Sequence, residues 1–205
     1  MTTSVPAKND MNLNTFGLVV CGGSSSRMGT DKSMLQYFEK PQRYHIYDML
    51  LHFCEKVFIS CNEVQAATID DRYHFIKDDH AFSNMGPMAA LLTAYNKFPK
   101  KNILFIGCDY PFLTTAELQN FLSSCGNGLS GFYNAEARFY EPLLALYPAS
   151  SAEELNRLYE AKQFSLQHFL KDHNAIKYFP QDQNSMLSID THEAYIKAKE
   201  NIQED

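Results

Sequence analysis

The sequence lacks the paired Cys-x-x-Cys spacing that many zinc and thiol redox sites use. Its five cysteines are odd in number and lie mostly in or beside apolar runs, so they indicate reduced thiols in the core and a reducing compartment. The seven histidines show no paired metal-binding spacing on an expected helix. The sequence therefore does not predict a zinc site.

Long apolar runs are also missing. The N-terminal residues have no apolar core of the kind found in secretory signals, and no run elsewhere is long enough to span a membrane. Basic residues are too few for a nucleic-acid footprint, since 18 Lys and Arg stand against 24 Asp and Glu, a formal net charge of -6. We expect a soluble cytoplasmic protein that binds neither nucleic acid nor membrane.

The length of 205 residues suits one domain with a substantial core. Residues 1–15 are polar and show no periodicity, so we expect a mobile N-terminal tail. Residues 16–202 carry no repeat, no low-complexity tract and no linker. The sequence therefore predicts a single domain over 16–202.

Short apolar runs alternate with helical periodicity in the first half of the chain. The runs expected to form strands are 16–21, 56–60, 74–77 and 103–108, and the segments expected to form helices are 46–53, 88–95 and 115–122. This alternation is typical of a Rossmann-like α/β fold, a three-layer sandwich with a mostly parallel, mixed central sheet. In such folds the ligand binds at the carboxyl ends of the strands.

The second half follows a different pattern. Aromatic-rich runs at 128–134 and 142–147 predict a hairpin, or a pair of strands, that covers one side of the cleft. We expect two helices at 153–161 and 166–170, a strand at 175–179 and a final capped helix at 191–201. Residues 33–37 are expected to form a short extended piece.

A glycine-rich segment at 22–32 directly follows the first expected strand. Gly22 and Gly23 allow close backbone approach to a ligand, and Arg27 and Lys32 supply positive charge, as a polyphosphate site requires. The segment matches neither the P-loop, because Thr30 and Asp31 separate Gly29 from Lys32, nor the Gly-x-Gly-x-x-Gly dinucleotide fingerprint. The alternative is a flexible surface linker.

Acidic residues follow two of the expected strands. Asp109 ends the fourth strand, where a carboxylate can hold Mg²⁺ against a triphosphate; alternatively, it caps the next helix or turn. Asp78 and Asp79 end the third strand, where one of them can accept hydrogen bonds from a base or ribose, or simply begin a turn.

Two of these segments carry a specific pattern. Residues 22–32 read Gly-Gly, small residues, Arg-Met-Gly-x-Asp-Lys, and residues 108–111 read Cys-Asp-x-Pro. With these motifs the chain resembles the molybdenum-cofactor guanylyltransferases, a branch of the nucleotidyltransferases. Residues 86–90 are similar to the Gly-Pro-Leu-Ala-Gly segment of that family, with Ala90 in place of the last glycine.

The resemblance continues near the C-terminus. Residues 188–193 are similar to the family's Asn-x-Asn-Thr-Pro-Glu, with Asp190 in place of the second asparagine. Asp190 either aids a metal or caps the last helix, and we expect the cap. Glu141 to Tyr147 resembles a family segment of the form x-Pro-x-x-Ala-Leu, which is also a plain core strand.

The resemblance implies transfer of GMP from Mg-GTP to the phosphate of molybdopterin, with Mg²⁺ as cofactor and with further proteins that deliver or receive the product. It implies that Lys32, Arg27 and Asp109 are catalytic and that Asp109 holds the metal. The nucleotide-binding residues that it implies are Val20, Cys21, Gly22, Gly23, Ser24, Lys32, Ser60, Asn62, Asp78 and Asp109.

Two alternatives stay open. The same loop occurs in cytidylyltransferases and sugar-1-phosphate nucleotidyltransferases, so the base and the acceptor are undecided. A nucleotide-binding regulatory module without catalysis is a second alternative, against which the presence of both Lys32 and Asp109 argues.

Overall fold

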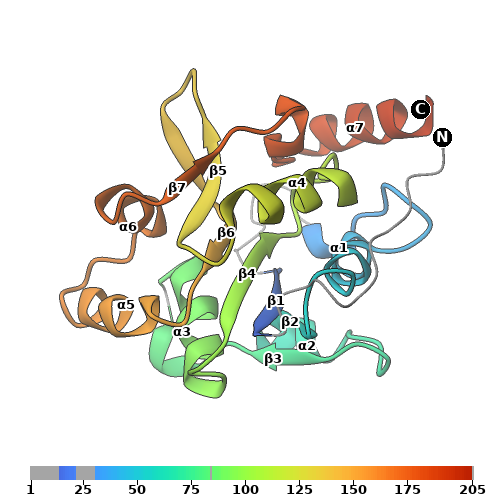
Figure 1. Cartoon of the computed structure of the whole chain (residues 1–205). Coiled ribbons are helices and arrows are strands. Elements are labelled where there is room, and N and C mark those ends of the chain that lie inside the picture. Colours follow the sequence, from blue (N-terminus) through green and yellow to red (C-terminus); the bar gives the residue numbers. More distant parts are fainter. Residues whose placement is uncertain (1–13, 22–30, 84, 205) are drawn as a thin grey trace.

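Four parallel strands form the first half of the sheet. The computed structural model describes residues 14–21, 31–83 and 85–204 (Figure 1). The adjacent strands, in the order β3-β2-β1-β4, are β3 (Phe75–Lys77), β2 (Lys56–Cys61), β1 (Thr15–Val20) and β4 (Asn102–Gly107). All four strands expected from the sequence are confirmed. β1 begins one residue inside the expected tail, and residues 1–13 of that tail lie outside the described residues.

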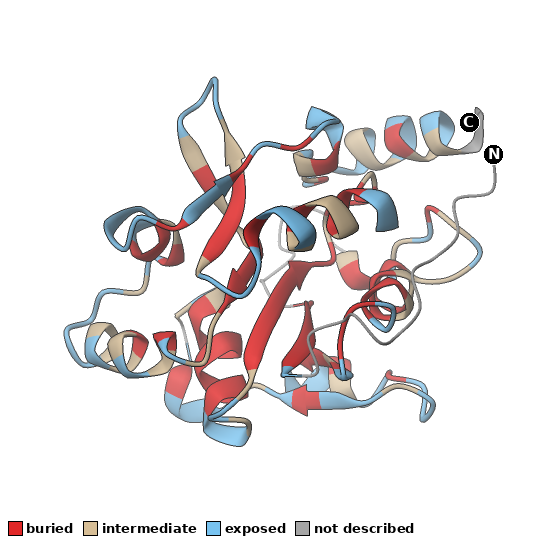
Figure 2. Cartoon of the chain, in the orientation of Figure 1, coloured by how far each residue is buried: buried red, intermediate tan, exposed pale blue. Residues whose placement is uncertain are grey.

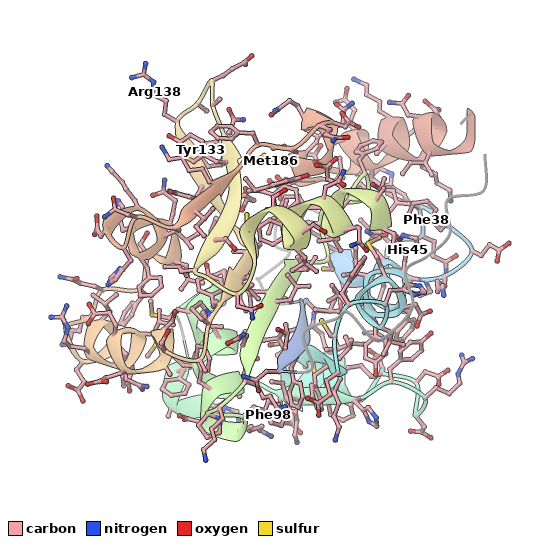
Figure 3. The ribbon with its side chains drawn as sticks, in the orientation of Figure 1. Phe38, His45, Phe98, Tyr133, Arg138 and Met186 are labelled. Atoms are coloured by element: carbon pink, nitrogen blue, oxygen red, sulfur yellow. The ribbon has the colours of Figure 1, made fainter. Side chains whose placement is uncertain are left out.

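Three further strands complete a mixed sheet with the order β3-β2-β1-β4-β6-β5-β7 in the described chain. β6 (Phe139–Tyr147) runs antiparallel to β4 and to β5 (Ser130–Asn134), which confirms the expected hairpin, and β7 (Ile176–Tyr178) lies parallel to β5. Asn134 Oδ1 accepts the Ala137 N–H at 2.8 Å in the hairpin turn. Arg138, with φ of 57°, lies at the tip of this hairpin (Figure 3).

Helices cover both faces of the sheet. Val19 points into a core with α1 (Gln42–Leu50) and α4 (Thr115–Cys125). Val20 points to the opposite face, as alternate strand residues must. The helices that pack on that face are α3 (Pro87–Lys97), α5 (Ser151–Glu160) and α6 (Leu166–Asp172). Figure 2 shows the buried central strands between these layers, which confirms the three-layer α/β fold.

Short helical turns connect several strands. They are η2 (Lys32–Met34), α2 (Glu63–Ala66), η3 (His80–Phe82) and η4 (Gln183–Met186). The expected extended piece at 33–37 is wrong for its first two residues. Asp31 Oδ1 accepts the Ser33 N–H at 3.0 Å, and this cap turns the chain into η2 before it extends at Leu35.

The C-terminal helix α7 (His192–Glu204) runs three residues past its expected end at 201. It packs on the segment after η2, where the Tyr37 and Tyr195 rings lie 5.1 Å apart and the Tyr195 hydroxyl donates to the Gln36 carbonyl at 3.1 Å. This packing brings the residues around 190 to those around 32. Within the described residues, every helix falls short of the length and apolarity that a membrane span needs.

Candidate active site

The predicted site residues that the structure describes gather at one edge of the sheet. β1, β2, β3 and β4 are adjacent and parallel, so their carboxyl ends meet there. The residues at or just beyond these ends are Val20, Cys21, Ser60, Asn62, Asp78 and Asp109. Of the other predicted residues, Lys32 also lies at this edge, and Gly22, Gly23, Ser24 and Arg27 lie outside the described residues.

Lys32 contacts a carboxylate from the far end of the chain. Its Nζ forms an ion pair with Asp190, and the two side chains are 21% and 51% exposed. The Ile189 N–H donates to the Asp109 carbonyl oxygen at 2.9 Å, which fixes the segment before α7 against the end of β4. Lys32, Asp109 and Asp190 therefore form one charged cluster.

Asp190 does not cap α7, so our expectation of a cap is wrong. The Thr191 hydroxyl accepts the Ala194 N–H at 3.2 Å and supplies the side-chain cap of the first turn. The Asp190 carboxylate instead reaches Lys32, because the packing of α7 on the segment after η2 carries it there. Asp190 therefore belongs to the charged cluster with Lys32 and not to the cap of α7.

Asp109 lies in an environment that suits a metal ligand. Burial raises the pKa of its carboxyl group, Lys32 lowers it and Asp190 raises it again. The next helix does not need Asp109 as a cap, because the Thr114 hydroxyl accepts the Glu117 N–H at 3.1 Å. A carboxylate that is partly desolvated and close to a second carboxylate gains from a divalent cation.

Glu141 is a member of this cluster that the sequence interpretation missed. It lies on β6, close enough to the buried Tyr110 for each group to affect the pKa of the other. Burial, together with the charges of Asp109 and Asp190, raises the pKa of Glu141 to about 7. Its place before Pro142, in the segment that resembles the family, is the sequence signal for this residue.

The described residues fit Mg²⁺ better than a metal that needs a protein cage. Within 14–21, 31–83 and 85–204, no group of three or more His, Cys, Asp or Glu residues is arranged to hold a metal ion. Mg²⁺ is usually bound through one or two carboxylates together with substrate phosphates and water. Asp109 and Asp190 provide such a pair.

A pocket of about 270 Å³ lies at the same edge of the sheet, between the end of β1 and the start of α3. Val20 and Ala90 form part of its apolar wall, and Asn62 and Asp78 are among its polar groups. Ala90 is the residue that replaces a glycine of the family pattern, so its methyl group belongs to this wall. The pocket combines an apolar wall with a few polar groups, as ligand sites commonly do.

Both aspartates after β3 line the pocket. Asp79 Oδ1 accepts the Ala81 N–H at 2.9 Å as the cap of η3. Ser60 is only 1% exposed and its hydroxyl donates to Asp78 Oδ1. Ser60 therefore acts on the pocket through Asp78, while burial raises the pKa of the Asp78 carboxyl group.

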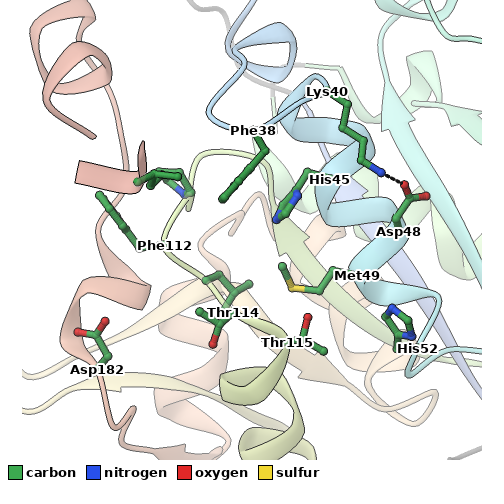
Figure 4. A pocket seen from close by; sticks show the side chains of 13 residues that line it. Phe38, Lys40, His45, Asp48, Met49, His52, Phe112, Thr114, Thr115 and Asp182 are labelled. Carbon is green, nitrogen blue, oxygen red and sulfur yellow. Dashed lines mark hydrogen bonds and ion pairs between the residues drawn. The ribbon is translucent and has the colours of Figure 1, made fainter. Parts of the chain in front are cut away.

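A second cavity, of about 580 Å³, lies between α1 and the start of α4 (Figure 4). The Phe38 and His45 rings stack there with centroids 4.0 Å apart, and Lys40 pairs with Asp48. None of the described residues that line it was predicted to bind the nucleotide. The charged cluster and the 270 Å³ pocket, rather than the larger cavity, therefore make up the candidate site.

Comparison with known proteins identifies the family of this chain. A family model described as the MobA-like NTP transferase domain matches residues 17–176. The chain belongs to the MobA-like NTP transferase family. The resemblance drawn from the sequence motifs is thereby confirmed, and the chain is a nucleotidyltransferase.

Relatives within and around this family cover most of the chain. A molybdenum cofactor biosynthesis bifunctional protein of Synechocystis is 31% identical over 64% of this chain. The match covers only 38% of that protein's own length. A molybdenum cofactor guanylyltransferase of Shewanella sediminis is 23% identical over 89% of this chain and 94% of its own.

A solved structure shares the fold. Molybdopterin-guanine dinucleotide biosynthesis protein A from Archaeoglobus fulgidus superposes with a TM-score of 0.74, covers 93% of this chain and 100% of its own, and is 22% identical. At this level of identity the likeness supports the fold alone.

Proposed function

We propose that the chain transfers GMP from Mg-GTP to the phosphate of molybdopterin, which releases pyrophosphate and forms the guanine dinucleotide cofactor. The observation that carries the proposal is the cluster of Lys32, Asp109 and Asp190 at the carboxyl edge of the sheet, the edge that also holds the pocket with Asp78. The names of the curated relatives, molybdenum cofactor guanylyltransferases, support the choice of GTP and molybdopterin.

The reaction requires positioning and charge neutralisation more than a side-chain nucleophile. An oxygen of the molybdopterin phosphate forms a bond to the α-phosphorus of GTP. The bond from that phosphorus to the α,β-bridging oxygen breaks, and pyrophosphate leaves with the electron pair. Asp109 and Asp190 would hold Mg²⁺, which, when bound, orients the phosphates and neutralises their charge.

Lys32 would exchange one anionic partner for another during binding. Its ion pair with Asp190 is partly exposed, and a pair of that kind contributes little stability. A triphosphate offers Lys32 a more highly charged partner, and the same exchange frees Asp190 for the metal. Backbone N–H groups from Gly22 to Ser24 would bind the phosphates together with Lys32 and Arg27.

The pocket chemistry favours guanine. Ionised Asp78 can only accept hydrogen bonds, and Ser60 occupies Oδ1 as a donor. Guanine offers two adjacent donors, N1–H and the N2 amino group, on its Watson–Crick edge. Adenine and cytosine each present a donor beside an acceptor, so their edges match a carboxylate less well.

Pyrophosphate release with each of the four Mg-NTPs, in the presence of molybdopterin, tests this function. We expect release with GTP to exceed release with CTP, ATP or UTP by at least tenfold. A preference for CTP would support the cytidylyltransferase alternative, and release with a sugar 1-phosphate as sole acceptor would support the sugar nucleotidyltransferases. Nucleotide binding without release under any of these conditions would support a regulatory module.

A further inference from the structure

The side-chain amide of Gln65 joins three segments at the carboxyl edge of the sheet. Its Nε2 donates to the Cys21 carbonyl oxygen at 3.2 Å and to Asp31 Oδ2 at 3.1 Å. Its Oε1 accepts the Asn62 N–H at 3.1 Å. Gln65 is only 7% exposed, and both of its N–H donors are used. Two acceptors face Nε2 and one donor faces Oε1, so these partners fix the orientation of the amide.

Of the two partners of Nε2, Cys21 directly precedes the glycine-rich segment and Asp31 lies near its C-terminal end. Cys21 directly follows β1, where its N–H donates to the Ser60 carbonyl at 3.2 Å. Asp31 directly precedes Lys32 and is bonded through both carboxylate oxygens, since Oδ1 accepts the Ser33 N–H. One amide group therefore ties the end of β1 to the residue next to Lys32.

These bonds exceed what the local helix requires. Asn62 and Gln65 form the capping box of α2, in which the Gln65 N–H donates to Asn62 Oδ1 at 2.9 Å and Gln65 Oε1 accepts in return. A capping box needs only an acceptor oxygen from the residue at position 65, and glutamate supplies one equally well. The two donors of Nε2 serve Cys21 and Asp31 alone.

We propose that Gln65 is a positioning residue for nucleotide binding. Its amide holds Cys21 and Asp31 at a fixed separation and thereby places the Lys32 ammonium group beside Asp109 and Asp190. The inference rests on the proposed function, because Lys32 matters here as a ligand for the nucleotide phosphates. Glutamate at position 65 would keep the cap of α2 and lose the clamp.

Gln65→Glu tests the clamp without removing the helix cap. The new carboxylate would face the Asp31 carboxylate and the Cys21 carbonyl. None of these groups can donate a hydrogen bond, so both bonds from position 65 would be lost and the two carboxylates would repel each other. We expect Gln65→Glu to bind Mg-GTP about tenfold more weakly than the wild-type chain, or weaker still. The KM for GTP should rise by a larger factor than kcat falls. Gln119→Glu is the matched control, because Gln119 donates to the Ser123 hydroxyl within α4, away from the carboxyl edge of the sheet. The control should bind Mg-GTP as the wild-type chain does.

A compensating change distinguishes a clamp from general damage. Asp31→Asn can keep its bond to the Ser33 N–H but presents an amide N–H to the Nε2 group of Gln65, so it should also weaken binding. In the double variant, the new amide at position 31 can donate to the new carboxylate at position 65, and the donor–acceptor pair is restored with reversed polarity. We expect the double variant to bind Mg-GTP more tightly than either single variant, by at least threefold.

The outcomes separate the two proposals. Wild-type chain that binds no Mg-NTP would overturn the proposed function and this inference together. If the wild-type chain binds Mg-GTP, and Gln65→Glu binds it with the same affinity as Gln119→Glu, the inference alone would be overturned. Weak binding in both single variants without recovery in the double variant would also overturn it. If Gln65→Glu does not fold, Asp31→Asn decides alone, and wild-type affinity in that variant would overturn the clamp.

Discussion

Replacing Lys32 by alanine should weaken Mg-GTP binding by an amount that the structure bounds. The wild-type chain gives up the Lys32–Asp190 ion pair when Lys32 turns to the phosphates. A partly exposed pair of this kind contributes about 0 to 1 kcal/mol. A charge-assisted contact to phosphate contributes about 1.5 to 3 kcal/mol. The net loss in Lys32→Ala is therefore about 0.5 to 3 kcal/mol, or about two- to a hundredfold in affinity.

Isothermal titration of Mg-GTP at two salt concentrations measures this loss. Lys40→Ala is a suitable control, because Lys40 also pairs with an aspartate but lies at the larger cavity, away from the predicted nucleotide site. We expect Lys32→Ala to bind more weakly than Lys40→Ala and to show a smaller salt dependence than the wild-type chain. Equal affinity for the two variants, with unchanged salt dependence, would refute the assignment of Lys32 to the phosphates.

Four further outcomes are expected. Asp109→Asn should lower kcat far more than it weakens GTP binding, because Mg²⁺ contributes most as charge builds in the transition state; near wild-type turnover at saturating Mg²⁺ would contradict this. Mg-GTP should raise the thermal unfolding midpoint more than equal Mg-CTP or Mg-ATP, and an equal or larger shift with CTP would favour a cytidylyltransferase. Arg43→Ala should lower the free energy of unfolding by about 3 kcal/mol in urea titrations, because the fully buried guanidinium donates to the Tyr44 hydroxyl at 2.8 Å and the Thr68 carbonyl at 2.5 Å; a loss below about 1 kcal/mol would count against this. In metal-free protein, the free energy of unfolding should fall as pH rises from 4.5, the ordinary pKa of a glutamate, towards about 7, because folded Glu141 holds its proton more tightly than the unfolded residue does. The slope should reach at most about 1.4 kcal/mol per pH unit, and Glu141→Gln should remove it.

The sequence was most informative where local pattern decides structure. β1 and β4 are buried at every position, and continuous apolar runs are typical of central parallel strands. Pro87 begins α3 and Thr114 caps α4, as their residue types predict. Once these strands are known to be parallel and adjacent, the meeting of Asp78 and Asp109 at one edge follows.

Side-chain partners that depend on distant packing could not be predicted in this way. Asp190 resembles a helix cap in the sequence, but the packing of α7 against Tyr37 directs it to Lys32, 158 residues away. Glu141 owes its raised pKa first to burial, which the strand pattern does not reveal. Both residues follow from tertiary contacts rather than local propensity.

Two polar residues near strand ends show a related limit. Ser60 occupies a position where a direct nucleotide contact was expected, yet its hydroxyl is buried against Asp78. Gln65 carries no recognisable signal beyond the capping box that it forms with Asn62. Its bonds to Cys21 and Asp31 depend on how β1, η2 and α2 pack together, and short sequence motifs do not reveal this packing.

The fate of the GTP phosphates tests the central claim most directly. The chain would be incubated with Mg²⁺, molybdopterin and GTP labelled either at the α-phosphate or at the γ-phosphate. The account predicts that the α-label appears in a guanine dinucleotide product and the γ-label in pyrophosphate, in equal amounts, and that Asp109→Asn forms little of either. Release of γ-labelled orthophosphate, or retention of the α-label in free nucleotide, would contradict nucleotidyl transfer at this site.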